Sequence, residues 1–377
     1  MVLFGLLFVP VLIGLAGLLL GKGLITWKEL IAQEAVVVLL IVVGYLIALH
    51  AQTSDTEIWN GVIASKTAGR ERCCHTYSCD CHEVCSGSGK NRSCHTECDT
   101  CYHHGGRKTG WDGDLTWDAS SSNGEHVFHD GCNSPGSSAP ARWNAIYLGE
   151  PTAVEHSYTN YIKGNPDTIL RRTGAAARFQ GRIPAYPSVY DYYRADRLLA
   201  VGVTVPDRQR LSARLSEINA TLGSPKQVNI TVIVVNEGDQ AYLEGLREAW
   251  LGGKKNDLVV VIGAPNFPEI AWAGVMSWTR NEEVKLAIRD RIAGMRTFDG
   301  DAVLSVVAEE VRAKFVRRPM ADFEYLRSTI EPPSWACWLL FVLGCLASLG
   351  LTWYFWVADP FGDGSPRYGS GYGRRSW

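Results

Sequence analysis

The sequence predicts an external α/β domain with a mixed sheet flanked by helices, a small cysteine-rich insert and three transmembrane helices. Three observations lead to this fold class. Three apolar runs are long enough to cross a bilayer, eight cysteines crowd into residues 73–101, and amphipathic helices alternate with continuous apolar strands beyond residue 206. With 20% charged and 46% apolar residues, the composition excludes wholesale disorder, and 377 residues suffice for two or three structural units.

The first apolar run covers residues 1–20 and contains no charged side chain. A helix rises about 1.5 Å per residue, so this run matches the roughly 30 Å hydrocarbon thickness of a bilayer. Pro10 lies in its middle, where the missing N–H predicts a kink that a membrane helix tolerates. The run is therefore predicted to be the first transmembrane helix.

The other two apolar runs cover residues 35–50 and 335–358. The second run lies between Glu34 and His50, and it spans a membrane only if these polar ends reach the interface. A cleaved signal peptide is the alternative, although the start of the chain lacks the basic segment of such peptides. The third run is the clearest, because Trp and Tyr residues mark both of its ends.

Basic residues outside the apolar runs predict the orientation. The positive-inside rule places the loop between the first two runs and the Gly-rich tail, residues 359–377, in the cytoplasm. Residues 52–143, 144–206 and 207–326 then lie on the periplasmic or extracellular side. The basic residues concerned are Lys22, Lys28, Arg367, Arg374 and Arg375.

The cysteine-rich module, residues 73–101, has almost no apolar side chain and cannot form a hydrophobic core. Covalent or metal crosslinks must therefore hold it together. An even count in an oxidising compartment favours up to four disulfide bonds, whose pairing the sequence does not determine. Zinc is the alternative, because histidines lie among the cysteines. The spacing lacks two well-separated CxxC pairs, so the disulfide interpretation is favoured. The candidates are Cys73, Cys74, Cys79, Cys81, Cys85, Cys94, Cys98 and Cys101.

Three further cysteines lie outside this module. Cys132 is unpaired by count, so it is free, pairs within the module or links two chains into a homo-oligomer. Cys337 and Cys345 fall in the third apolar run, where they are expected to act as small apolar residues. The acidic segment Trp111–Asp118 has oxygen ligands for calcium but not the spacing of an EF-hand, so a solvated loop is expected.

Residues 144–206 contain short apolar bursts separated by Gly and Pro, which predict short strands and turns, including strands at 145–148 and 158–162. Four tyrosines in this segment could form an aromatic surface that binds a ligand. Packing of a small sheet is the favoured explanation for them. They are Tyr186, Tyr190, Tyr192 and Tyr193.

Beyond residue 206 the hydrophobic periods become regular. Helical spacing predicts a helix over 211–222 that Gly223 ends, and β-branched runs predict buried strands at 228–235 and 258–262. Asp239 is expected to open a second helix, lined by Leu243, Leu246 and Trp250, that Gly252 and Gly253 end. A third strand at 270–278 and helices at 281–295 and 301–317 complete the prediction.

The order helix, strand, helix ending in Trp250, Gly turn, and Asn256-Asp257 before a strand resembles the TPM domain of bacterial and plastid membrane-anchored proteins. The resemblance covers residues 207–326, and it implies either acid phosphatase activity or a role as an interaction module. The chain departs from the family at residues 264–268, where the family has a basic residue and a Gly-rich turn. A membrane helix and a Gly-rich tail often follow this domain, and Gly362–Gly373 fits that pattern. The whole layout, with its paired membrane helix and cysteine-rich insert, is also similar to membrane proteins of bacterial viruses.

Two functions follow from these patterns. The first is a structural or interaction module at the cell envelope, whose partners are the bilayer and an envelope or membrane protein. A net charge of −2 argues against a nucleic-acid partner, and no motif indicates a cofactor. The alternative is a membrane-anchored hydrolase of phosphate esters. Its candidate acids, each also suited to a helix cap or a turn, are Asp207, Asp239, Asp257, Asp299 and Asp301.

Overall fold

The computed structural model describes residues 2–20, 25–71, 76–86, 93–102, 114–133, 137–165, 174–358 and 360–361. The chain forms two compact units, each described by itself. The helical unit comprises Met1–Asp55, Tyr158–Thr168 and Met320–Trp377, and the mixed unit comprises Thr56–Ser157 and Ile169–Pro319. The chain therefore passes between the two units four times.

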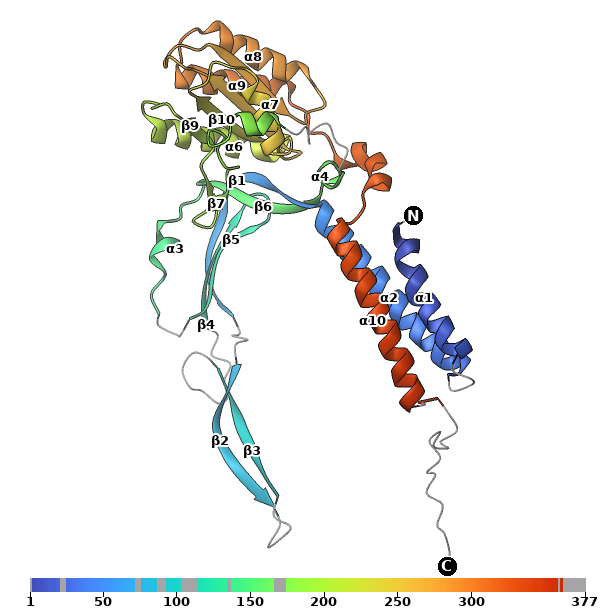
Figure 1. Ribbon diagram of the computed structural model, residues 1–377. Helices are drawn as coiled ribbons and strands as arrows, with labels where there is room; N and C mark the ends of the chain where they lie inside the picture. Colours follow the sequence, from blue (N-terminus) through green and yellow to red (C-terminus); the bar gives the residue numbers. More distant parts are fainter. Residues whose placement is uncertain are drawn as a thin grey trace, which may run out of the picture. The chain divides into compact units, whose positions relative to one another are not determined.

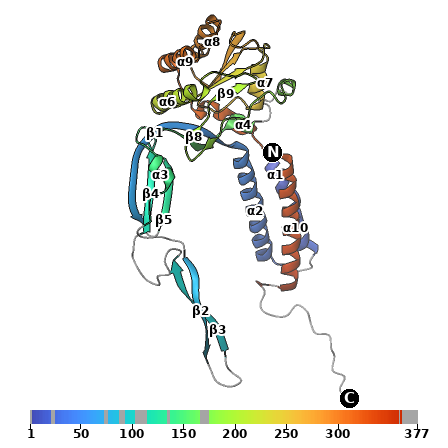
Figure 2. The ribbon, with the colours of Figure 1, turned by 90° about the vertical axis from the view of Figure 1, so that its left-hand side faces the viewer.

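Three long apolar helices form most of the helical unit: α1 (Val2–Leu20), α2 (Trp27–Thr53) and α10 (Ser334–Ala358). They lie side by side in both views (Figures 1 and 2). Each is long and apolar enough to cross a membrane, as the three apolar runs predict. A short helix, α4 (Tyr161–Gly164), and a 3-10 helix, η3 (Met320–Thr329), complete the unit.

Helix α2 begins eight residues before the second apolar run, because Thr26 and Glu29 form a reciprocal capping box at its start. Gln33, which lies before the second apolar run, is consequently inside the bundle and only 1% exposed. Its amide donates to Ser348 Oγ at 2.9 Å and accepts from Thr352 Oγ1 at 3.1 Å, while Ser348 donates to the Pro10 carbonyl at 2.7 Å. Side-chain hydrogen bonds thus connect all three helices.

The mixed unit contains the predicted α/β layer. Its sheet has the order β12-β11-β10-β9, with β9 (Leu198–Val201), β10 (Asn229–Val235) and β11 (Asp257–Gly263) parallel and β12 (Trp272–Ser277) antiparallel. Every residue of β10 and β11 is buried, as expected of strands covered on both faces.

Helices cover both faces of this sheet (Figure 2). One face packs on α6 (Arg208–Lys226), α8 (Glu283–Gly294) and α9 (Gly300–Lys314). The other packs on α7 (Tyr242–Ala249) and on Phe179, which follows α5 (Ala175–Arg178). The predicted α/β class is confirmed. Gly223, however, does not end the first helix, which continues to Lys226.

A second sheet has the order β5-β4-β1-β6. Its strands are β1 (Ser54–Glu71), β4 (Asp114–Ser121), β5 (His126–Asn133) and β6 (Pro151–Thr159). The long strand β1 is central, and its core residue Ile63 packs with Trp117, Phe128 and Tyr193. A two-stranded hairpin, β7 (Val189–Tyr190) and β8 (Arg194–Ala195), completes this part.

Two local predictions in this region are wrong, and a third is correct only in part. Asp114–Asp118 is not a loop but part of β4, because Trp117 joins the core and Asp118 pairs with His129 at 2.6 Å; residues 111–113 lie outside the described part. Residues 145–148 are not a strand: α3 (Ala141–Ala145) ends there, and Ile146 follows in extended backbone. Residues 158–162 divide between the end of β6 and α4.

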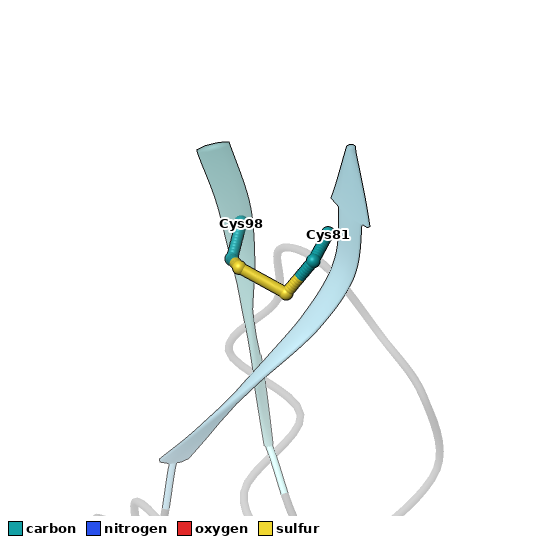
Figure 3. The surroundings of a disulfide bond; sticks show 2 residues. All are labelled: Cys81 and Cys98. Carbon is teal, nitrogen blue, oxygen red and sulfur yellow. A yellow bond between two sulfur atoms is a disulfide. The ribbon is translucent and has the colours of Figure 1, made fainter. Parts of the chain in front are cut away.

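The cysteine-rich module contains an antiparallel hairpin of β2 (Thr76–Ser86) and β3 (Ser93–Tyr102). Cys79 lies opposite Asp99 and His82 opposite Glu97, so a bulge puts two residues opposite Cys98. Cys81 is one of them, and it forms a disulfide with Cys98, with sulfurs 2.07 Å apart (Figure 3). The other candidate side chains, and that of Cys132, lie outside the described residues.

The Cys81–Cys98 pair can be tested by alkylation. We expect neither thiol to react with a maleimide before reduction, and both to react after it. Replacing Cys98 with Ser should free Cys81 and make it reactive without reductant. Peptide mass spectrometry gives the readout, because the crosslinked form lacks two hydrogens. Labelling of both thiols in the unreduced parent protein would contradict the disulfide.

Candidate functional site

The predicted acidic residues do not meet in one cleft. Asp299 caps α9 by accepting from the Ala302 N–H at 3.0 Å, and Asp239 accepts from the Ala241 N–H at 2.9 Å. Asp207 is at the start of α6, but its side chain makes no capping hydrogen bond. Asp239 and Asp299 therefore serve the helix starts that the sequence also allowed.

Asp301 lies on the surface between two arginines. Arg210 makes a bidentate pair with its carboxylate, at 3.0 and 2.7 Å, and Arg214 makes a second ion pair. These guanidinium groups lower the pKa of Asp301 to about 2. Asp301 is thus an ionised partner of two cations rather than an acid suited to proton transfer.

The four tyrosines do not form one platform either. Tyr193 is fully buried and donates to Glu150 Oε2 at 2.9 Å, and burial together with Glu150 raises its pKa to about 12. Tyr186 donates to Asp257, whereas Tyr190 and Tyr192 are 51% and 60% exposed. Packing, the favoured explanation, accounts for Tyr193.

The most distinctive arrangement is at the amino ends of the parallel strands, where the start of β1 lies against the α/β layer. Asn60 Nδ2 donates to the Val228 carbonyl at 3.0 Å, next to the first residue of β10. Asn256, just before β11, donates to the Ile58 carbonyl at 2.7 Å. Arg197, just before β9, donates to Asn60 Oδ1. One segment of β1 therefore binds the starts of three strands.

A buried polar network extends from this contact. Asn229 Oδ1 accepts from Arg197 at 3.2 Å, and Asn229 Nδ2 donates to Asp257 Oδ1 at 2.9 Å, so one amide links a buried cation to a buried carboxylate. Burial lowers the pKa of Arg197 to about 10. It raises the pKa of Asp257 to about 6, against the opposing hydrogen bonds from Lys254 N–H, Asn229 and Tyr186.

Close backbone approach completes the contact. A Cβ atom on Gly223 would lie 2.4 Å from Asn60 Cβ and 2.7 Å from its carbonyl oxygen. Gly223 is therefore required for contact between α6 and β1, and this contact rather than a helix cap accounts for a glycine at this position. Asn60, Arg197 and Asn229 belong to no motif that predicts this role.

The raised pKa of Asp257 predicts a dependence of stability on pH. Its folded pKa of about 6 exceeds the ordinary 3.8, so the folded state binds more protons between these values and stability falls as pH rises. The contribution of Asp257 alone should make the free energy of unfolding roughly 1 kcal/mol lower at pH 7 than at pH 5. The measurement is the urea midpoint of the parent protein and of Asp257→Asn at pH 5 and at pH 7. If the midpoint changes equally with pH in both proteins, the prediction is contradicted.

A cavity of about 730 Å³ opens beside the same segment of β1. Tyr186 and Trp250 form an aromatic wall, with ring centroids 5.1 Å apart, and Trp250 Nε1 donates to the Pro184 carbonyl at 2.9 Å. The Lys254 ammonium lies 5.4 Å from the centre of the Tyr186 ring, and Glu155 is the other charged lining residue. The cavity thus joins a fixed apolar surface to two opposite charges.

Within the described ranges, no three His, Cys, Asp or Glu side chains are grouped so that they could hold a metal ion. No family model, curated protein or solved structure matches the chain. The resemblance of residues 207–326 to the TPM domain therefore stays a prediction.

Proposed function

We propose that the chain is a multi-pass membrane protein whose mixed unit is an interaction module for another protein at the cell envelope. The observation that carries this proposal is the cavity between Tyr186, Trp250 and the start of β1. Large aromatic side chains dominate the binding energy of protein interfaces, and cavities of this size accept an inserted side chain or short segment.

The walls of this cavity support binding because they are already held in place. The Tyr186 hydroxyl is fixed by Asp257 at 2.9 Å and the Trp250 indole by a backbone carbonyl, so little side-chain freedom is lost when a partner binds. Lys254 and Glu155 would orient the partner through opposite charges.

The alternative, a phosphate-directed hydrolase, receives less support. It needs a metal or converging acids to polarise a phosphoryl group. Among the described candidates, Asp239 and Asp299 bind helix starts, Asp301 binds two arginines and Asp257 is buried. Turnover of p-nitrophenyl phosphate by the purified chain, lost in Asp239→Asn, would favour this alternative.

Photo-crosslinking tests the interaction proposal in the full chain in its native membrane. A benzophenone amino acid replaces Ser188, an exposed residue that lines the cavity, and Glu309, exposed on α9, serves as the control position. A discrete adduct is expected from position 188 only. It should disappear when Ala249→Trp, a substitution of an exposed lining residue, narrows the cavity. Absence of an adduct, or equal adducts at both positions, would overturn the proposal.

The proposed orientation has its own test. The cytoplasmic assignment depends on Lys22, Lys28 and the arginines of the tail. A protease added to intact cells, or to spheroplasts if an outer membrane intervenes, should digest the mixed unit and spare a tag placed after Trp377. Permeabilised cells serve as the control, in which the tag should also be lost. Loss of the tag in intact cells would contradict the orientation.

A further inference from the structure

A second cavity, of about 200 Å³, also borders the start of β1. It is built from four parts of the mixed unit: Trp59 of β1, Asn123 in the β4–β5 turn, Ser224 and Gln227 at the end of α6, and Asn256 before β11. Ile58 contributes to both cavities. The small cavity is independent of the interaction site proposed above, because it shares none of that site's aromatic or charged residues.

Two side chains of this cavity have hydrogen-bonding atoms that nothing in the described part of the chain satisfies. Asn256 is 1% exposed; its Nδ2 is used by the Ile58 carbonyl, but its Oδ1 has no donor. Asn123 Oδ1 accepts from the Glu125 N–H at 3.3 Å, whereas its buried Nδ2 has no acceptor. Leaving a buried polar group without a partner is unfavourable, so a ligand that supplies both partners gains binding energy.

The chemistry of the lining defines the ligand. The described lining residues include amides, a hydroxyl and an indole, but no ionisable side chain. No described lining side chain would supply a countercharge to a phosphate, a carboxylate or a metal ion. The indole of Trp59 is held in place by stacking on His156, with ring centroids 3.6 Å apart, and supplies a flat apolar surface.

We propose that this cavity binds a neutral sugar ring. A hydroxyl group both donates and accepts, so neighbouring hydroxyls of one ring can satisfy Asn256 Oδ1 and Asn123 Nδ2 together. The apolar C–H face of the ring packs on an indole. Ser224 and Gln227, both exposed, form the mouth through which the ring enters.

Ordered water is the competing occupant, because the cavity has the volume of roughly six or seven liquid water molecules. Saturable binding of a sugar distinguishes the two. The full chain is placed in lipid nanodiscs, since many detergents have sugar headgroups. Glucose, galactose and N-acetylglucosamine are then titrated while saturation-transfer NMR records contact with the protein. Saturable transfer to at least one of the three is expected.

Matched variants locate the binding. Ser224→Phe should block the mouth and abolish saturable transfer, whereas Thr221→Phe, which adds the same ring at an exposed position of α6 outside the cavity, should leave it unchanged. Asn123→Ala removes one donor from a turn and should weaken binding about fivefold, as expected for one hydrogen bond. No saturable binding of any of the three sugars, or unchanged binding in both Ser224→Phe and Asn123→Ala, would overturn the proposal.

Discussion

Replacing Val234 with Asp is expected to unfold the α/β layer of the mixed unit. Val234 is fully buried in β10, opposite Ala200 of β9 and Ile262 of β11. An aspartate there would be a buried charge without a partner, which costs several kcal/mol and approaches the whole stability of an ordinary domain. We expect loss of the cooperative unfolding transition in urea.

The matched control for this substitution is Val316→Asp, because Val316 is 48% exposed. Its change should stay within about 0.5 kcal/mol, as is usual for surface positions. Proteolysis of the full chain in nanodiscs gives a second measure, since only the first variant should expose new sites throughout residues 207–319. Parental stability of Val234→Asp would refute the buried position of this strand.

Replacing Asn60 with Leu is expected to have the next largest effect. The leucine has a similar volume but leaves the Arg197 guanidinium without one of its acceptors. It also removes the side-chain donor of the Val228 carbonyl and one of the two donors of Asn229 Oδ1. Since each buried unsatisfied group costs about 1–3 kcal/mol, a total loss of about 3 kcal/mol or more follows. Ser65→Leu, at an exposed position of the same strand, is the control.

Hydrogen exchange would show where this loss occurs. In Asn60→Leu, amides at the start of β1 and at the amino ends of β10 and β11 should exchange faster than in the parent protein. The carboxyl ends of the same strands should change less. If the amides of the two proteins exchange at the same rates, the network adds nothing to the contact between β1 and the α/β layer.

Much of the α/β layer could be predicted because local patterns determine it. The strand β10 is an unbroken run of buried residues, and the apolar positions of α9 recur at helical spacing onto one face. Alternate residues of β10 then face opposite cores: Val232 and Val234 pack on one side, Ile233 and Val235 on the other. Such a continuous apolar run therefore predicts a strand that is buried on both faces, even when the neighbouring strands are not known.

The sheet around β1 could not be predicted, because its pairing is not local. Ile63 lies opposite Ser121, and the intervening residues include the whole cysteine-rich module. The strand itself is rich in polar and small residues, and Lys66 to Glu71 contain no large apolar side chain. Apart from Thr67, these residues have low strand propensity, and Thr67 to Arg70 are exposed. Pairing with β4, which is distant in the sequence, makes this segment a strand.

The polar site residues were missed for a related reason. Asn60, Arg197 and Asn229 are ordinary surface residue types, and their roles depend on the meeting of three separate segments. One signal was available: an asparagine at or next to the start of a mainly apolar strand, as in Asn229 and Asn256, is unusual enough to suggest a buried amide. Which partners these amides bind is a tertiary property.

The hydrogen bond between Gln33 and Ser348 joins residues 315 positions apart in the sequence. A ribosome that adds 5–20 residues per second needs roughly 15–60 s to make that interval. During this time α1 and α2 are present without α10, and the Gln33 amide lacks both of its partners. A membrane insertase or chaperone that shields this amide would therefore act before translation ends. Truncation before Ser334 should turn this brief stage of biogenesis into a lasting one and direct the chain to membrane quality control.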